Sequence, residues 1–319
     1  MSLAEDSRSR PAGGVHLSPR LEGTLLAAAA VVAFSFSFPA TVWTLSGFGP
    51  WSAAGLRGAI AAVVAGAALL LTAPKDLTAP KDSGPGKPEA RLSRRDWLGL
   101  PVVAVGCVIG FPVLTTLALQ TSTTAHSAVV IGALPMATAT ISSWLTGKRQ
   151  SPVFWAAASV GALSVVAFTL SQNHGRPTVA DLYLFAALLL CAAGYAEGGR
   201  LTTQLARWRV IAWAVVLAAP VCLGISVWAL RHEPVQLTPT SLGGLAYLAL
   251  VSQFFGFVLW YRGMALIGVA RASQLQLAQP LLTLVWAVLL MGERLSPAAP
   301  ATALVVLVCI AVTQRARTS

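Results

Sequence analysis

The chain has 319 residues, of which 56% are hydrophobic and only 10% are charged. A soluble globular domain carries about 25% charged residues, so this composition argues against a soluble protein and predicts one that is built for lipid. The net charge of +11 does not indicate nucleic-acid binding, because the basic residues stand between apolar runs and form no stripe interleaved with aromatics. The four cysteines lie in apolar segments without metal-ligand spacing, so no metal or cofactor is expected.

Ten apolar runs approach or exceed the length of about 20 residues that a helix needs to cross a bilayer. They cover residues 24–45, 51–72, 97–119, 123–145, 153–171, 182–201, 210–230, 242–261, 271–291 and 298–314. The alternation typical of a β-barrel is absent from them, so the expected fold is an all-α integral membrane protein with ten transmembrane helices. A loop at about 73–96, rich in Pro, Gly and charge, is expected to be a mobile linker.

The basic residues fall mainly in every second connection between the predicted spans. With the N-terminus in the cytoplasm, 18 Lys and Arg lie in cytoplasmic segments and three in outer loops. Basic residues are enriched on the cytoplasmic side of membrane proteins. Both terminal tails, residues 1–23 and 315–319, are therefore expected in the cytoplasm, and the protein in the cell's inner (plasma) membrane.

The second half of the chain repeats part of the first at an offset of 145 residues. Residues 125–152 align without a gap on residues 270–297, with nine of 28 positions identical, and the matches include Pro135 with Pro280. In each half this segment is the fourth of five predicted spans, and because five is odd the second half should be inverted. The expected units are 24–173 and 174–314. Lys148 is replaced by Glu293 in the copy, which we attribute to the change of membrane side.

Ten spans in two halves, with both fourth spans ending in Pro, eleven residues and Gly-[Glu/Lys]-Arg, resemble the EamA-type family of the drug/metabolite transporter superfamily. The stretch WYRGMALIGVARASQLQLAQPLLTLVWAVLLMGERLSP is similar to that family's second repeat, and GLRGAIAAVV to its second helix. GYAEGGRLTTQL looks like the start of its second half, whereas VAFSFSFPATVW lacks the Trp-Gly often found in its first helix. The likeness covers about residues 24–314 and implies a transporter with a cavity between the halves.

Polar residues in the ninth predicted span recur every three or four positions, which places them on one helix face. They are Ser273, Gln276, Pro280 and Thr283, with Gln279 beside them, and Gln253 on the preceding span could face them. Such a stripe either lines an aqueous cavity or forms hydrogen bonds across helices. Pro135 and Pro280 remove the helical partners of the Ile131 and Gln276 carbonyls, so each is expected to be either a packing kink or a hinge.

Three ionisable residues within or beside the predicted spans are candidates for binding or coupling. Arg57, about seven residues into the second span, either reaches the outer interface or backbone carbonyls, or binds a substrate carboxylate. Glu197 is the one acid inside a predicted span, and it either pairs with Arg200 or carries a coupling proton. His126, at the outer mouth of the fourth span, is either a hydrogen-bonding cap or a titrating group.

These pocket candidates are amides, hydroxyls and aromatics, which suit amino acids or similar small amphipathic metabolites better than phosphorylated ones. The expected function is export of such metabolites by alternating access about a midplane cavity, with a proton as the possible coupling partner. A non-transporting membrane sensor or scaffold is the alternative. An intramembrane enzyme is less favoured, because the sequence contains no HExxH, no GxSxG and no paired intramembrane aspartates.

Overall fold

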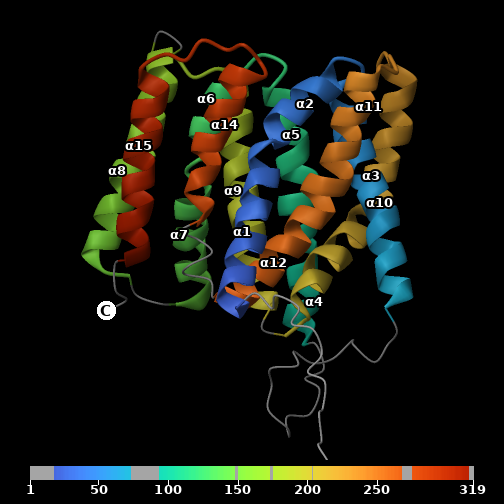
Figure 1. Ribbon diagram of the computed structural model, residues 1–319, viewed down its shortest axis with the longest axis horizontal. Helices are drawn as coiled ribbons and strands as arrows, with labels where there is room; N and C mark the ends of the chain where they lie inside the picture. The colour runs from blue at the N-terminus through green and yellow to red at the C-terminus, as the bar shows by residue number, and fades with distance from the viewer. Residues whose placement is uncertain are drawn as a thin grey trace, which may run out of the picture.

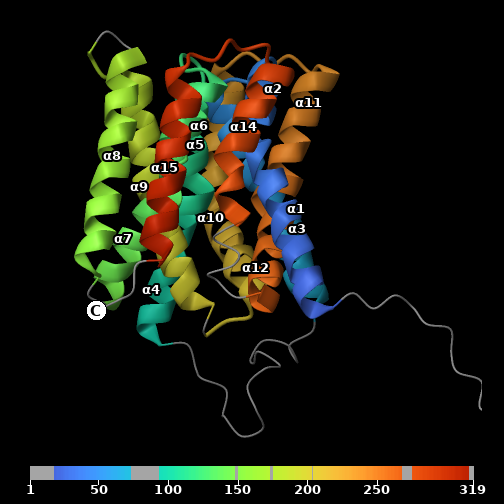
Figure 2. The ribbon, with the colours of Figure 1, turned by 60° about the vertical axis from the view of Figure 1, so that its left-hand side comes forward.

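The computed structural model describes residues 18–72, 93–147, 150–172, 175–202, 204–267 and 275–315. All named secondary-structure elements in these ranges are helices, and they stand side by side in one bundle (Figures 1 and 2). The lower end of the bundle in Figure 1 is the end at which α4 (Arg94–Val103) begins. The upper end is the one at which α6 (Thr124–Ile131) begins.

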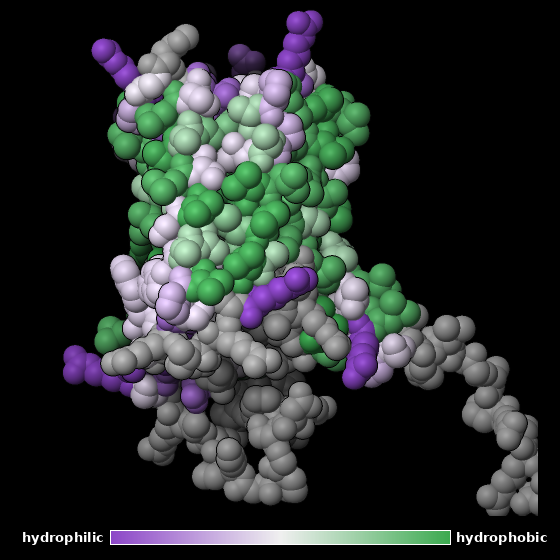
Figure 3. Space-filling model, turned by 90° about the vertical axis from the view of Figure 1, so that its left-hand side faces the viewer, coloured by the Kyte–Doolittle hydropathy of each residue, from purple (hydrophilic) through white to green (hydrophobic). Residues whose placement is uncertain are grey.

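Among the described residues, eight helical stretches are long and apolar enough to cross a membrane. They are Pro19–Leu45, Pro50–Leu71, Arg94–Ala118, Thr124–Leu145, Pro152–Gln172, Val179–Leu201, Trp208–His232 and Pro239–Met264. Two shorter apolar helices, α14 (Ala278–Leu289) and α15 (Ala298–Arg315), follow them. On the face shown in Figure 3, apolar side chains form a belt between polar ends. The protein is therefore an all-α, multi-pass membrane protein.

Four of these stretches are interrupted, and four are continuous helices. The interrupted ones consist of α1 (Pro19–Ser35) with α2 (Ser37–Leu45); α4 with the π-helix η2 (Ala104–Gly110) and α5 (Phe111–Ala118); α6 with α7 (Leu134–Thr146); and α11 (Pro239–Ala246) with η3 (Tyr247–Phe255) and α12 (Gly256–Ile267). The continuous ones are α3 (Pro50–Leu71), α8 (Pro152–Gln172), α9 (Val179–Leu201) and α10 (Arg207–His232). Interruptions inside membrane helices are tolerated where protein surrounds them.

The two matched prolines stand at helix starts. Pro135 lies in the first turn of α7, after a break at Gly132 and Ala133, and Pro280 is the third residue of α14, after a turn at Leu277. A proline is tolerated in a first turn because the N–H that it lacks has no partner there. Each proline therefore begins a new helix, whereas the sequence placed both prolines in the middle of a span.

Backbone features recur at the offset of the sequence match. Gly147 and Gly292, which follow α7 and α14, have φ of 66° and 65°, a left-handed conformation that glycine adopts without steric cost. Shifted by 145 residues, η2 falls on the second part of η3. In Figure 1, α7 ends at the lower end of the bundle and α14 at the upper end. Equivalent sequence thus has equivalent local conformation at opposite ends.

The core forms where small residues let helices approach closely. α3 packs along α10, α1 along α12, α8 along α15, and α6 against α14. Alanines such as Ala61 and Ala65 of α3 and Ala214 and Ala218 of α10 are almost fully buried. These pairings join segments from the two halves of the chain, so the centre of the bundle contains residues from both.

Several helices begin about three or more residues earlier than the hydropathy pattern indicates, and α1 and α4 are examples. Ser18 caps α1, which starts at Pro19, and Ser93 forms a capping box with Asp96, so that α4 starts at Arg94. Capping side chains satisfy the first free N–H groups of a helix. A helix start that depends on such polar residues cannot be located from the length of an apolar run. The expected loop at 73–96 therefore ends before Arg94, and its residues 73–92 lie outside the described ranges.

Candidate functional site

A small cavity lies between the break that precedes α7 and the turn that precedes α14. Its volume is about 20 Å³, little more than one water molecule requires. It is lined by Phe38, Ala128, Ile131, Gly132, Leu134, Pro135, Gln276, Leu277, Gln279, Pro280, Thr283, Leu307 and Ile310. The predicted polar face of the second half therefore meets the matched apolar segment of the first half. Ser273, the remaining member of that face, lies outside the described residues.

The polar side chains of the cavity wall differ in whether they have a hydrogen-bond partner within the protein. The Thr283 hydroxyl is 2.9 Å from the Ser35 carbonyl oxygen and 3.0 Å from that of Gln279. Within the described part of the chain, no hydrogen bond engages the Gln276 amide, although this residue is only 8% exposed. Gln276 is therefore a group of this wall whose amide is available to a polar ligand.

The break between α1 and α2 connects this cavity to a second polar group. Ser35 Oγ accepts a hydrogen bond from the indole N–H of Trp286 at 2.9 Å, beside its backbone contact with Thr283. On the other side of the break, the hydroxyls of Ser37 and Ser252 are 2.7 Å apart. The sequence analysis did not select either serine of α1 and α2. The one available signal was a pair of small polar residues inside an apolar span.

Arg57 belongs to this second group. Its Nη2 donates to Ser252 Oγ at 3.1 Å, and its Nε has no partner among the described residues. The residue as a whole is only 6% exposed. Gln253 is similar, because its Nε2 donates to the Cys107 carbonyl at 3.4 Å while its Oε1 has no described partner. Arg57 is therefore directed into the protein, and it does not line the small cavity.

Glu197 lies at the lower end of the bundle and is engaged by a cation. Its Oε1 is 2.7 Å from Arg200 Nη2, the pairing that the three-residue spacing predicts. Arg200 Nη1 also contacts Asp96 Oδ1 at 2.6 Å, a partner that the sequence analysis did not identify. The three side chains connect α9 to the start of α4.

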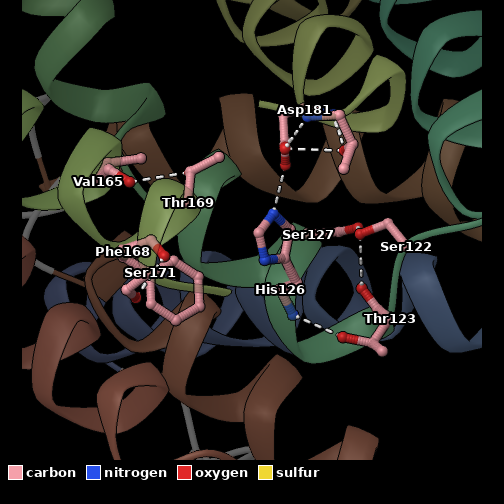
Figure 4. A network of polar contacts seen from close by, with 10 residues as sticks. Ser122, Thr123, His126, Ser127, Val165, Phe168, Thr169, Ser171 and Asp181 are labelled. Atoms are coloured by element: carbon pink, nitrogen blue, oxygen red, sulfur yellow. Dashed lines mark hydrogen bonds and ion pairs between the residues drawn. The ribbon is translucent and has the colours of Figure 1, made fainter. Parts of the chain in front are cut away.

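His126 contacts an acid at the upper end. Its Nε2 is 2.7 Å from Asp181 Oδ1, and its ring stacks on that of Phe168 with 5.2 Å between centroids (Figure 4). The capping hydroxyl of α6 belongs to Thr123, which accepts the His126 backbone N–H at 3.1 Å. His126 is thus not the side-chain cap of this helix. Its imidazole joins α6 to α9.

Two further acids bind helix starts at the upper end, and the sequence analysis assigned neither contact. Glu293 accepts the backbone N–H groups of Thr124 and Ala125 at 2.7 and 2.8 Å. Glu233 accepts those of Trp51 and Ser52 at 3.1 and 2.8 Å. Negative charge is favourable at a helix start. The contact adds a local reason for glutamate at position 293, beyond the change of membrane side inferred from the repeat.

The described residues contain no group of three or more His, Cys, Asp and Glu side chains that could hold a metal ion. The site consequently consists of two neighbouring polar groups that are joined through Ser35 and Ser37. One contains Gln276, Gln279 and Thr283 beside the broken helices. The other contains Arg57, Ser252 and Gln253. Such an arrangement can bind a small polar molecule within an apolar bundle.

Comparison with known proteins identifies the family. The EamA-like transporter family matches residues 21–170 and again residues 178–314. A Bacillus subtilis (strain 168) protein named uncharacterized transporter YdeK is 40% identical over 285 residues, which are 89% of this chain and 94% of that protein. The uncharacterized transporter YcbK of the same organism is 34% identical over 116 residues, 34% of this chain and 37% of its own length.

A solved crystal structure has the same fold, with a TM-score of 0.61 and 19% identity over 92% of this chain and 96% of its own. The apolar helices, the double family match and the long alignment with YdeK agree with one another. The chain belongs to the EamA-like transporter family and is a membrane transporter.

Proposed function

We propose that the protein is a secondary transporter that exports small amphipathic metabolites, such as amino acids, by alternating access. The observation that carries this proposal is the position of the cavity, which lies where the two matched segments at Pro135 and Pro280 are both broken. Transporters commonly bind substrates near the midplane between discontinuous helices, whose freed backbone groups face the ligand. At about 20 Å³ the cavity is too small to hold a metabolite in this conformation, so binding requires the surrounding helices to move apart.

The proposed architecture is ten spans in two inverted five-helix units, 24–173 and 174–314, with both termini in the cytoplasm at the inner membrane. The double family match supports it, as do the left-handed glycines after α7 and α14. The 18 basic residues assigned to one side and three to the other orient the bundle, with the upper end outside. Reporter fusions at residue 319 test this arrangement, and an external C-terminus would exclude it.

In this proposal the second half supplies most of the polar contacts with substrate. Gln276, Gln279 and Thr283 face the cavity, Ser273 is a further candidate from the sequence, and Pro135 and Pro280 mark the hinges beside the cavity. Arg57 and Gln253 bind the opposite end of the substrate once the bundle opens. Their unpaired Nε and Oε1 offer one cationic donor and one acceptor, which suits a molecule with a carboxylate and an amino or hydroxyl group.

A proton is the proposed coupling partner, with His126 as the candidate site. We assign Glu197 to structure, because Arg200 and Asp96 already hold it between α9 and α4. Replacing His126 with Gln should then abolish flux driven by a pH gradient while substrate counterflow, which needs no proton gradient, continues. Equal loss of both activities would remove His126 from coupling.

Efflux from proteoliposomes tests the function directly. Vesicles containing the purified protein are loaded with a mixture of radiolabelled amino acids, and release is compared with protein-free vesicles and with vesicles carrying the Gln276→Leu protein. The proposal expects saturable release that the substitution weakens. A sensor or scaffold would release none of the amino acids above the protein-free rate, and this outcome would reject amino-acid export.

A further inference from the structure

The first element that separates the cavity from the upper end is α6. This helix has only eight residues, and all of them except His126 are buried. It begins at the upper end, and its lower part contributes Ala128, Ile131 and the capping Gly132 to the cavity wall. Because the chain is broken immediately below it, α6 can move without carrying α7 with it. A shift of α6 would therefore change the wall of the cavity on its upper side.

Two acids from distant parts of the chain hold the upper end of α6. Glu293, which follows α14, takes two backbone N–H groups of the first turn at 2.7 and 2.8 Å. Asp181, in the first turn of α9, takes the His126 ring at 2.7 Å (Figure 4). The two contacts approach the same turn from different helices. Each is a charge-assisted hydrogen bond, a class stronger than its neutral counterparts.

Both acids are themselves fixed in position. Asp181 is 1% exposed, and its Oδ2 accepts the backbone N–H and the hydroxyl of Thr178 at 2.7 and 2.8 Å. Glu293 directly follows the left-handed Gly292, and its own N–H donates to the Ala287 carbonyl at 3.0 Å. The acids are therefore anchored to α9 and α14 before they bind α6. Movement of α6 away from Glu293 and from α9 has to break both contacts.

We infer that α6 is the upper gate of the transport path, and that Glu293 and Asp181 are positioning residues that hold the gate closed. This inference rests on the proposed transport function. It adds to that function a defined moving element, and it identifies what a substrate or proton must overcome to open the site on this side. The His126 ring is the point at which Asp181 acts on the gate.

Accessibility of Ala128 measures the state of the gate without any substrate. Ala128 is 2% exposed, and the four native cysteines are buried. An Ala128→Cys variant should thus react slowly with a hydrophilic maleimide in detergent. Adding Glu293→Gln or Asp181→Asn should raise the reaction rate about tenfold, the factor expected when one charge-assisted hydrogen bond no longer holds the closed state. The same variants without Ala128→Cys give the background.

Glu233 provides a matched control. It binds the first N–H groups of α3 just as Glu293 binds those of α6, but α3 is unbroken from Pro50 to Leu71. Glu233→Gln should therefore lower thermal stability and leave the Ala128→Cys rate unchanged. Equal acceleration by Glu233→Gln, or no acceleration by Glu293→Gln and Asp181→Asn, would overturn the inference.

Two further measurements keep the test decisive. If Glu293→Gln protein is not monodisperse, Glu293→Asp keeps the charge but shortens the side chain, and it should also accelerate labelling. Efflux is measured in parallel with the labelling. Altered labelling without any flux would retain the gate and reject the transport proposal, whereas normal flux with unaltered labelling would reject the gate alone.

Discussion

Arg57 is the most informative side chain to replace, because its structural and functional roles predict opposite results. The residue is 6% exposed, forms one described hydrogen bond, to Ser252 at 3.1 Å, and leaves Nε unpaired. A cation held in this way is a poor contributor to folding. A protein that retains it for binding should become more stable when the charge is removed, while it loses transport.

The expected size follows from the contacts. Arg57→Met removes one hydrogen bond to a charged group, which is worth about 1.5–3 kcal/mol. It also removes the desolvation penalty of a buried ion, which is several kcal/mol. Ser252 retains its contact with Ser37 at 2.7 Å, so the substitution orphans no hydroxyl. The free energy of unfolding should therefore stay constant or rise by up to about 3 kcal/mol.

The assay combines thermal unfolding in detergent with efflux from proteoliposomes. Arg57→Met should melt at or above the wild-type temperature and lose at least about tenfold in transport efficiency, because an ionic contact with substrate is removed. Arg57→Lys keeps the charge and serves as the matched control for volume and charge. A melting temperature well below the wild type for Arg57→Met, with normal efflux, would show that Arg57 is structural and refute the reasoning.

Four further substitutions separate binding from stability. Gln276→Leu should weaken substrate affinity about tenfold and change stability by less than about 1.5 kcal/mol; unchanged kinetics would remove Gln276 from the site. Glu197→Gln should leave efflux intact and lower stability by at most about 1 kcal/mol, since Arg200 is partly exposed; loss of pH-driven flux in folded protein would make it a coupling residue. Gly292→Ala should lower the free energy of unfolding by about 1 kcal/mol because Gly292 has a φ of 65°. Efflux should stay normal in this variant. Gly147→Ala should lower the melting temperature by a similar amount, because the φ of Gly147 is 66°.

The main features of the fold are predictable from the order of residues along the chain. Long apolar runs in lipid have to be helical, because no water satisfies the backbone there. The matched prolines and glycines locate the two equivalent segments, and three polar residues of the second one, Gln276, Gln279 and Thr283, do line a cavity. The helical spans are predictable because run length, proline and glycine act on the backbone within a few residues of themselves.

The partners of the polar side chains were decided by the tertiary structure. Arg57 meets Ser252 across 195 positions, and Glu293 meets Thr124 across 169. A helix start needs an acceptor for its free N–H groups, but no local pattern states which distant acid provides it. The packing of α6 against α14 and of α1 and α2 against their neighbours brings these groups together. Hydrogen bonding depends on distance in space, and the close approach of small residues sets that distance only when the helices pack.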